Sequence, residues 1–180
     1  MRWMIASDLH GSAFYTDLLL RRREAEGDPR LILLGDILYH GPRNDLPRDY
    51  DTKSVAQMLN KLDPMPLCVR GNCDTEVDQM VLSFPVMAEY ALLPLGDRTI
   101  LLTHGHRRQE FAPLLRSGDL LFYGHTHVPD FTVDNGVRFV NPGSVSIPKE
   151  DSPHSYLMLE EDRLFWKKVE TGEIFREERI

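Results

Sequence analysis

Five short apolar runs in this sequence each end in a small group of polar side chains that can bind metal ions. The groups contain Asp, Asn and His, whose oxygen and imidazole donors suit Mn, Fe, Ni or Zn. They are Asp8-Leu9-His10, Gly35-Asp36, Gly71-Asn72-Cys73-Asp74, His104-Gly105-His106 and Gly124-His125-Thr126-His127. Five groups in the same position relative to an apolar run predict one site built from five loops. Their donors are numerous enough for two ions.

Each group, taken alone, also has a structural explanation. Asp36 follows a glycine and would suit a turn or a helix cap, and Asn72 would suit an Asx turn with Asp74 as the next helix cap. The histidines argue most strongly for metal. Four of the seven in the chain fall in two short stretches, each directly after an apolar run. We therefore expect the five groups to converge on metal.

The elements that must position these groups alternate between strand and helix over the first two thirds of the chain. Apolar runs predict strands at 3–6, 31–34 and 67–69, and helical spacing predicts helices at 12–27, 55–62 and 77–84. Thr75 and Asp78 form a capping box for the third helix. Hairpins are expected at 90–102 and 131–140, with a short helix at 111–115 and a strand at 120–123 between them. Two or three further strands follow within 156–175.

This alternation predicts one compact α/β domain over residues 1–180, with two β-layers. Ligands of open α/β sheets bind outside the carboxyl ends of the strands. All five polar groups occupy that end of an expected strand. The topology and the residue chemistry therefore place the site at the same edge of the fold.

Composition narrows the class of protein. Hydrophobic residues make up 42% and charged residues 27%, which is ordinary for a globular domain. The net charge of −7 argues against extended nucleic-acid binding. Apolar runs of about five residues, against about 20 for a membrane helix, predict no membrane span and no signal peptide. Cys68 and Cys73 are too far apart along an extended segment to form a disulfide, so we expect a cytoplasmic protein.

The five groups, in this order and spacing, resemble the calcineurin-like metallophosphoesterases from Met1 to about Pro148. Within that superfamily, the segments 36–44, 71–74 and 141–148 are similar to the small bacterial YfcE-type phosphodiesterases. The resemblance implies a four-layer α/β/β/α sandwich with two mixed β-sheets. It also implies a dinuclear-metal enzyme that hydrolyses small phosphodiesters by attack of a metal-bridging hydroxide.

The resemblance implies two ligand sets that share Asp36 as a bridge. They are Asp8, His10 and His127 for one ion, and Asn72, His104 and His125 for the other. We expect two divalent ions, with Mn²⁺ as the first choice and Fe, Ni or Zn as alternatives. Such a pair, roughly 3.5–4 Å apart, clamps the attacking and leaving oxygens and lowers the pKa of bound water toward about 7.

Cys73 departs from the pattern of the wider superfamily, which usually has His here. That His is thought to stabilise the phosphate or to protonate the leaving oxygen. A thiol has a reference pKa near 8.5 and is a weak hydrogen-bond donor. We therefore expect Cys73 to support nitrophenol leaving groups better than alkoxides. The alternative is that Cys73 only packs beside the site.

Three further residues, Arg43, Asn44 and His106, are expected to contact substrate. The guanidinium fork of Arg43 suits phosphate oxygens; otherwise Arg43 would pair with Asp45 or Asp49 nearby. His106 could instead orient its neighbour His104.

Two other functions stay open. The retromer subunit Vps29 resembles this fold and serves mainly as a protein-binding scaffold with degraded metal ligands, whereas all seven ligand positions here hold competent donors. A phosphomonoesterase of the same fold is the second alternative. A purely structural zinc site fits least, because such sites usually rely on cysteine. The hairpin around Asn135 could serve a homo-oligomer interface.

Overall fold

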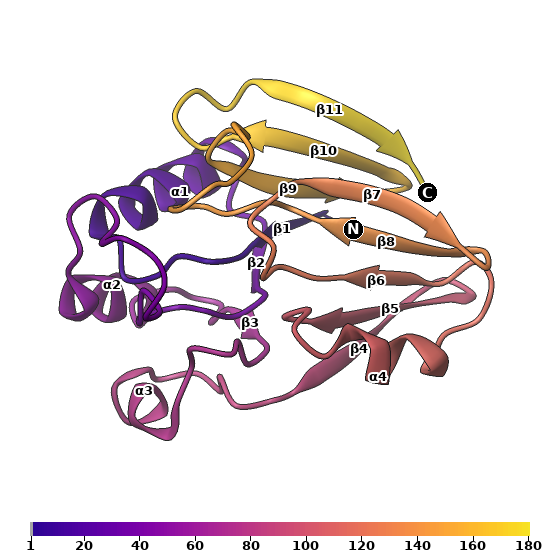
Figure 1. Ribbon diagram of the computed structural model, residues 1–180. Helices are drawn as coiled ribbons and strands as arrows, with labels where there is room; N and C mark the ends of the chain where they lie inside the picture. The colour runs from indigo at the N-terminus through magenta and orange to yellow at the C-terminus, as the bar shows by residue number, and fades with distance from the viewer. Residues whose placement is uncertain (1) are drawn as a thin grey trace.

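The computed structural model describes residues 2–180, which form two β-sheets packed face to face (Figure 1). The first sheet has the order β11-β10-β9-β1-β2-β3 and the second the order β4-β5-β6-β8-β7. The first comprises β1 (Arg2–Ala6), β2 (Arg30–Leu33), β3 (Leu67–Cys68), β9 (Ser155–Glu160), β10 (Arg163–Lys168) and β11 (Ile174–Arg179). The second comprises β4 (Tyr90–Leu95), β5 (Arg98–Thr103), β6 (Leu120–Phe122), β7 (Asp130–Asp134) and β8 (Val137–Asn141).

Both sheets mix parallel and antiparallel strands, as expected. In the first sheet β1, β2 and β3 run parallel while β9 pairs antiparallel with β1. In the second, β5, β6 and β8 run parallel and are flanked by antiparallel β4 and β7. Outer layers of helix complete the predicted α/β/β/α arrangement: α1 (Ala13–Ala25), α2 (Thr52–Leu59) and α3 (Glu76–Val81) on one side, and α4 (Arg108–Phe111) with the 3₁₀ turn Ala112–Leu114 on the other.

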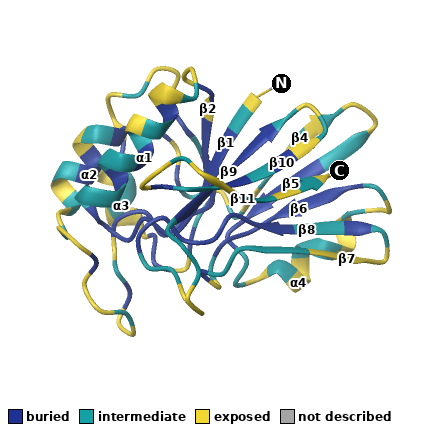
Figure 2. Cartoon of the chain, turned by 90° about the horizontal axis from the view of Figure 1, so that it is seen from above, coloured by how far each residue is buried: buried dark blue, intermediate teal, exposed yellow. Residues whose placement is uncertain are grey.

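The continuous apolar runs of the strands are explained by burial on both faces. Successive side chains of β1 alternate: Met4 packs toward Leu19 of α1, whereas Ile5 packs between the sheets near Phe122 of β6. Figure 2 shows the central strands as buried almost throughout. These strands are therefore a rigid support for the loops at their ends.

The parallel directions of β1, β2, β3, β5 and β6 confirm the expected position of the five polar groups. Each group begins within four residues after the carboxyl end of one of these strands. The capping box at α3 is also present, since the Asp78 carboxylate accepts a hydrogen bond from the Thr75 N–H at 2.7 Å. No helix within residues 2–180 is long and apolar enough to cross a bilayer.

The third helix, predicted at 77–84 from the spacing of its apolar residues, is shorter than expected and leaves most of those residues exposed. The helix ends at Val81, and Val77 and Met80 are 67% and 83% exposed. The side chain of Asn60 ends it, because its amide donates to the Val81 carbonyl and its oxygen accepts from the Ser83 N–H. The chain then turns inward, so that the core is filled by Phe84, which lies beyond the helix.

Candidate metal centre

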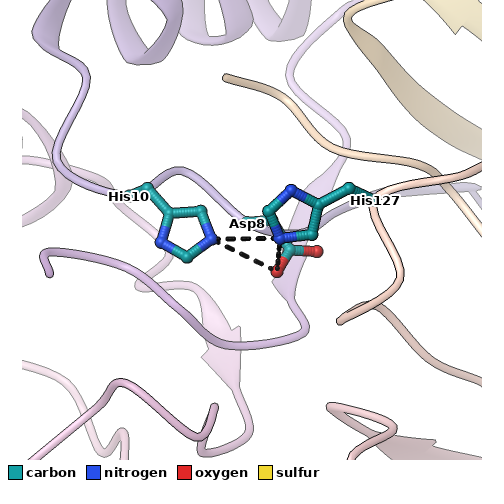
Figure 3. A group of neighbouring side chains, drawn as sticks. All are labelled: Asp8, His10 and His127. Carbon is teal, nitrogen blue, oxygen red and sulfur yellow. Dashed lines mark hydrogen bonds and ion pairs between the residues drawn. The ribbon is translucent and has the colours of Figure 1, made fainter. Parts of the chain in front are cut away.

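The loops after five strands bring carboxylates and imidazoles together at one buried place. Three overlapping groups of possible ligands have atoms that all lie within 4.8 Å of one another. Two consist of carboxylates and imidazoles, Asp8 with His10 and His127, and Asp8 with Asp36 and His104, whereas the third joins His10 and Asp36 with the Cys73 thiol. Figure 3 shows the first group, drawn from loops that are far apart in the sequence. The two carboxylates and three imidazoles of these groups are almost fully buried. The sequence predicted these carboxylates and imidazoles as metal ligands, and Cys73 as a neighbour that need not bind metal.

His10 and His127 are locked in the same tautomer. The Nδ1 atoms lie 2.7 Å from the Tyr39 carbonyl oxygen and 2.6 Å from the Ile147 carbonyl oxygen. Because a carbonyl only accepts, each Nδ1 must carry the hydrogen. In the neutral rings both Nε2 atoms then hold lone pairs, and they lie 3.2 Å apart. Such orientation by a backbone carbonyl is typical of metal-binding imidazoles.

His104 is held in the same way on the other side of the cluster. Its Nδ1 donates to the Leu34 carbonyl at 2.7 Å. Its Nε2 faces the Asn72 Oδ1 at 3.1 Å and the Asp36 Oδ2 at 3.4 Å. The carbonyl of Leu34 therefore orients this ring, and the alternative role suggested for His106 stays a prediction.

The part of the cluster around Asp8 fits a cation because, with neutral imidazoles, acceptors meet there without donors. The neutral His10 and His127 rings direct lone pairs at each other, and both Nε2 atoms also face the Asp8 Oδ1, at 3.6 and 3.4 Å. That oxygen is buried and has no hydrogen-bond partner among residues 2–180. Unsatisfied buried acceptors are costly, and a divalent cation would satisfy all of them together.

Electrostatics keep the two carboxylates ionised. Burial is the largest influence on Asp8 and would raise its pKa, yet the nearby imidazoles of His10, His127 and His104 hold that pKa well below its usual range. Burial would also raise the pKa of Asp36, but the nearby His104 outweighs burial and lowers that pKa. Burial would lower the pKa of His104, but Asp36 and Asp8 raise it to about 9. The two ionised carboxylates therefore offer negative charge to a cation.

Most of the predicted ligands have an unusual backbone conformation. Residues with side chains rarely adopt positive φ, and each such case costs on the order of 1 kcal/mol or more. The ligands with positive φ are Asp8 (59°), His10 (46°), Asp36 (54°), His125 (69°) and His127 (63°). At Asp8 the conformation is supported by the hydroxyls of Ser144 and Ser146, which both donate to the Asp8 carbonyl. The surrounding loops thus impose the arrangement of the donors.

Asp74, expected only as a helix cap, instead joins two of the loops. Its buried carboxylate accepts from the backbone N–H groups of Asp36, Ile37 and Gly71 at 2.7–2.8 Å. Burial is the main reason why the pKa of Asp74 is raised. Gly71 must lack a side chain, since a Cβ there would lie 2.1 Å from the Asp36 Oδ1. Both Gly71 and Asp74 therefore lie in close contact with Asp36, so this loop helps to hold that carboxylate in place.

The last two predicted ligands lie at the edge of the buried cluster. The Asn72 Oδ1 points toward His104, as described above. The half-buried ring of His125 lies 5.2 Å from the His104 ring, centroid to centroid, and its backbone N–H donates to the Asp8 Oδ2 at 3.1 Å. Asn141, whose side-chain amide donates to the Gly124 carbonyl at 2.9 Å, fixes the loop that carries His125.

A cavity of about 420 Å³ opens beside the cluster. Arg43, Asn44 and Cys73 line it, as expected of residues that meet substrate, and so does Lys149, which sequence reasoning missed. His106 is not among the lining residues; its ring lies 5.6 Å from that of His104. Within residues 2–180 Arg43 forms no ion pair, so the alternative pairing with Asp45 or Asp49 is absent.

The thiol of Cys73 is buried against this cavity. Its backbone N–H donates to the Asp36 Oδ1 at 2.8 Å, and the Asn72 amide lies 3.2 Å from its sulfur. Burial, followed by the charge of Asp36, raises the pKa of the Cys73 thiol. Neither Cys73 nor Cys68 forms a disulfide within the described chain, as predicted.

Comparison with known proteins agrees with the geometry. Residues 1–163 match the model of the calcineurin-like phosphoesterase superfamily domain. Phosphodiesterase YfcE of Escherichia coli K12 is 46% identical over 165 residues, covering 91% of this chain and 90% of that protein. The probable metallophosphoesterase YsnB of Bacillus subtilis is 31% identical over 167 residues, covering 88% and 83%.

Solved structures show the same likeness. The structure of YfcE, a phosphoesterase from E. coli, superposes with a TM-score of 0.91 at 40% identity and covers all of both chains. Vacuolar protein sorting 29 from Cryptosporidium parvum superposes with a TM-score of 0.64 at 19% identity, covering 99% of this chain and 98% of that one. At that level of identity the second match shows a shared fold alone.

Proposed function

The chain belongs to the calcineurin-like phosphoesterase superfamily, and we propose that it is a phosphodiesterase that cleaves small phosphodiesters with two divalent metal ions. The observation that carries this proposal is the meeting of acceptors at the carboxyl ends of five strands. The His10 and His127 lone pairs support one proposed place for a cation, and His104 with Asn72 supports a second.

Asp36 is the proposed bridge between the two ions. Its Oδ2 lies 3.6 Å from the His10 Nε2 and 3.4 Å from the His104 Nε2, so one carboxylate oxygen is near both places. Its other oxygen is held by the Cys73 N–H. We propose that Asp8, His10 and His127 complete one set of ligands and that Asn72, His104 and His125 complete the other.

When bound, two such ions supply positive charge for the phosphate and an activated water as nucleophile. The chain itself orients the imidazoles through backbone carbonyls, keeps Asp8 and Asp36 ionised and places Cys73 and Asn44 at the cavity. His106 remains a proposed substrate contact. The nitrogen and oxygen donors favour Mn²⁺ over thiophilic metals, with Fe, Ni and Zn as the other candidates.

The test is metal analysis combined with a comparison of two substrates. Bis(p-nitrophenyl) phosphate and p-nitrophenyl phosphate share a leaving group but differ in ester number. We expect the diester to be hydrolysed faster and Mn²⁺ to restore the activity of chelator-treated protein. A preference for the monoester would identify a phosphomonoesterase. A metal-loaded protein inert toward both esters would support a scaffold function.

We further propose that residues 1–180 form one domain, because β9, β10 and β11 extend the sheet that β1 begins. Two buried free cysteines are compatible with the proposed cytoplasmic location. The net charge of −7 makes extended nucleic-acid binding an unsuitable role.

Val133, 59% exposed on the hairpin of β7 and β8, is the proposed contact of a homo-oligomer, which light scattering would detect.

A further inference from the structure

We propose that Arg43 and Lys149 form an anion subsite in the cavity, and that this subsite selects phosphodiesters carrying a second negatively charged group. The inference rests on the proposed phosphodiesterase function and names the class of its substrate. Both side chains line the cavity beside the metal cluster, and they come from different loops, one after β2 and one after β8.

Lys149 is positioned by the same segment that orients a metal ligand. Its backbone N–H donates to the His127 carbonyl at 3.2 Å, and its own carbonyl accepts from the Ser152 hydroxyl at 2.6 Å. Two residues earlier, the Ile147 carbonyl fixes the His127 ring. The backbone of Lys149 is thus tied to the cluster, while its side chain is left for the cavity.

Arg43 belongs to a loop that packs against Cys73, on another part of the cavity wall. The Asn44 amide donates to the His40 carbonyl at 2.8 Å and closes a tight turn around Gly41. Gly41 packs so closely that a Cβ there would lie 3.3 Å from the Cys73 sulfur. The turn that presents Arg43 is therefore held at a fixed place beside the cavity.

Neither cation is neutralised by the protein. Among residues 2–180 no carboxylate lies within ion-pairing distance of Arg43 or Lys149, although the chain as a whole carries a net charge of −7. Asp36 is the one acid among the described lining residues, and its carboxylate faces His10 and His104 instead.

The charge count points to an additional anion on the substrate. A phosphodiester carries one negative charge, and the cleaved phosphate presents that charge to the metal cluster. Two further cations in the same cavity suit a second anionic group, which the planar fork of Arg43 and the ammonium of Lys149 would both contact. At about 420 Å³ the cavity falls within the usual range for small-molecule sites, so it has room for more than one phosphate.

Two matched pairs of diesters test this subsite. Thymidine 5′-(p-nitrophenyl phosphate) and its 3′-phosphorylated form differ only by a second phosphate. Phenyl p-nitrophenyl phosphate and its 4-carboxyphenyl counterpart differ only by a carboxylate. We expect kcat/KM to be about tenfold higher for the member that carries the second anionic group in at least one pair, mainly through a lower KM. The pair that responds shows whether the subsite prefers a phosphate or a carboxylate. Equal values within both pairs would overturn the subsite while leaving phosphodiesterase activity demonstrated.

Substitution then assigns the effect to these side chains. Lys149→Gln and Arg43→Gln should each reduce the ratio of kcat/KM within the responding pair to about threefold or less. Lys61, which is exposed and does not line this cavity, provides the matched control, and Lys61→Gln should keep the full ratio. Calorimetric binding of thymidine 3′,5′-bisphosphate and thymidine 5′-monophosphate to the metal-loaded proteins gives a readout independent of turnover. An unchanged ratio in both cavity variants would contradict the proposal.

Discussion

The Nε2 atoms of His10 and His127 face each other at 3.2 Å while both rings donate their Nδ1 hydrogens to backbone carbonyls. With both rings neutral, no hydrogen is available between them. Repulsion between the two lone pairs and the nearby Asp8 carboxylate is relieved only by a cation or by an added proton. The stability of this fold should therefore depend on bound metal.

The first prediction is that chelation lowers the melting temperature. A ligand present at about 100 times its Kd stabilises by about 2.7 kcal/mol, and 1 kcal/mol shifts Tm by about 2–4 °C in a protein of this size. We expect EDTA treatment to lower Tm by about 5–10 °C and Mn²⁺ to restore it, as measured by scanning calorimetry.

Two variants locate the origin of that shift. His127→Ala should show a much smaller difference between the metal-loaded and EDTA-treated protein. His154→Ala should keep the full difference, because His154 stacks on Tyr15 outside the cluster. Equal Tm values with and without metal in the unmodified protein would contradict the cation site.

The second prediction concerns the bridging role of Asp36. Asp36→Asn keeps an oxygen that can accept from the Cys73 N–H, but it places an amide where a carboxylate oxygen now faces His10 and His104. We expect at least a 100-fold loss of kcat for bis(p-nitrophenyl) phosphate and less than two bound metal ions per chain by elemental analysis.

Asp51→Asn is the control for this substitution. Asp51 caps α2 through its hydrogen bond with the Ser54 N–H and lies outside the cavity. Its activity and metal content should match those of the unmodified protein. Near-normal turnover by Asp36→Asn would refute the bridging assignment.

The third prediction concerns leaving-group dependence at Cys73. Burial raises the pKa of this thiol, so it stays protonated at neutral pH but is a poor acid. Diesters of nitrophenol need little protonation as they depart, whereas alkoxides need much more. Cys73→His should therefore raise kcat/KM for alkyl diesters by about tenfold and change that for nitrophenyl diesters much less. An unchanged dependence of rate on leaving-group pKa would indicate that Cys73 only packs beside the site.

Local pattern predicts the layers of this fold well, because the spacing of nearby apolar residues indicates where strands and helices form. The Asp-Asn-Gly turn at 134–136 is an example: Asn135 and Gly136 both have the positive φ that a tight hairpin requires. Prediction fails at α3, because its apolar residues have helical spacing but Asn60, distant in sequence, ends the helix and sends Phe84 into the core instead.

The metal cluster was predictable because its ligands recur at strand ends, where topology brings them together. Lys149 gave no such signal. It follows no strand directly. Its backbone is held beside the cavity by hydrogen bonds with His127 and Ser152, and the contact with His127 forms only in the folded protein. The role of Asp74 was missed for the same reason, since two of its three partners, Asp36 and Ile37, lie on another loop about 38 residues earlier.

The fourth prediction is that Asp74 couples stability to metal affinity. Its two oxygens accept three backbone hydrogen bonds, from Asp36, Ile37 and Gly71. Asp74→Asn replaces one acceptor oxygen with an NH₂ group that must face a backbone N–H. Leaving a buried donor unsatisfied costs about 1–3 kcal/mol. We expect Tm to fall by about 4–10 °C and the Kd for Mn²⁺ to rise about tenfold, as measured by calorimetric titration.

Asp78→Asn is the matched control, because Asp78 also accepts from a backbone N–H but does so in the capping box of α3. Losing that contact should cost about 1 kcal/mol or less and leave the Kd for Mn²⁺ unchanged. Comparison of the two variants identifies the coupling. General destabilisation would lower Tm in both variants, whereas displacement of Asp36 would weaken Mn²⁺ binding in Asp74→Asn alone. If Asp74→Asn lowered Tm without weakening Mn²⁺ binding, Asp74 would stabilise the loops but would not position the bridging carboxylate.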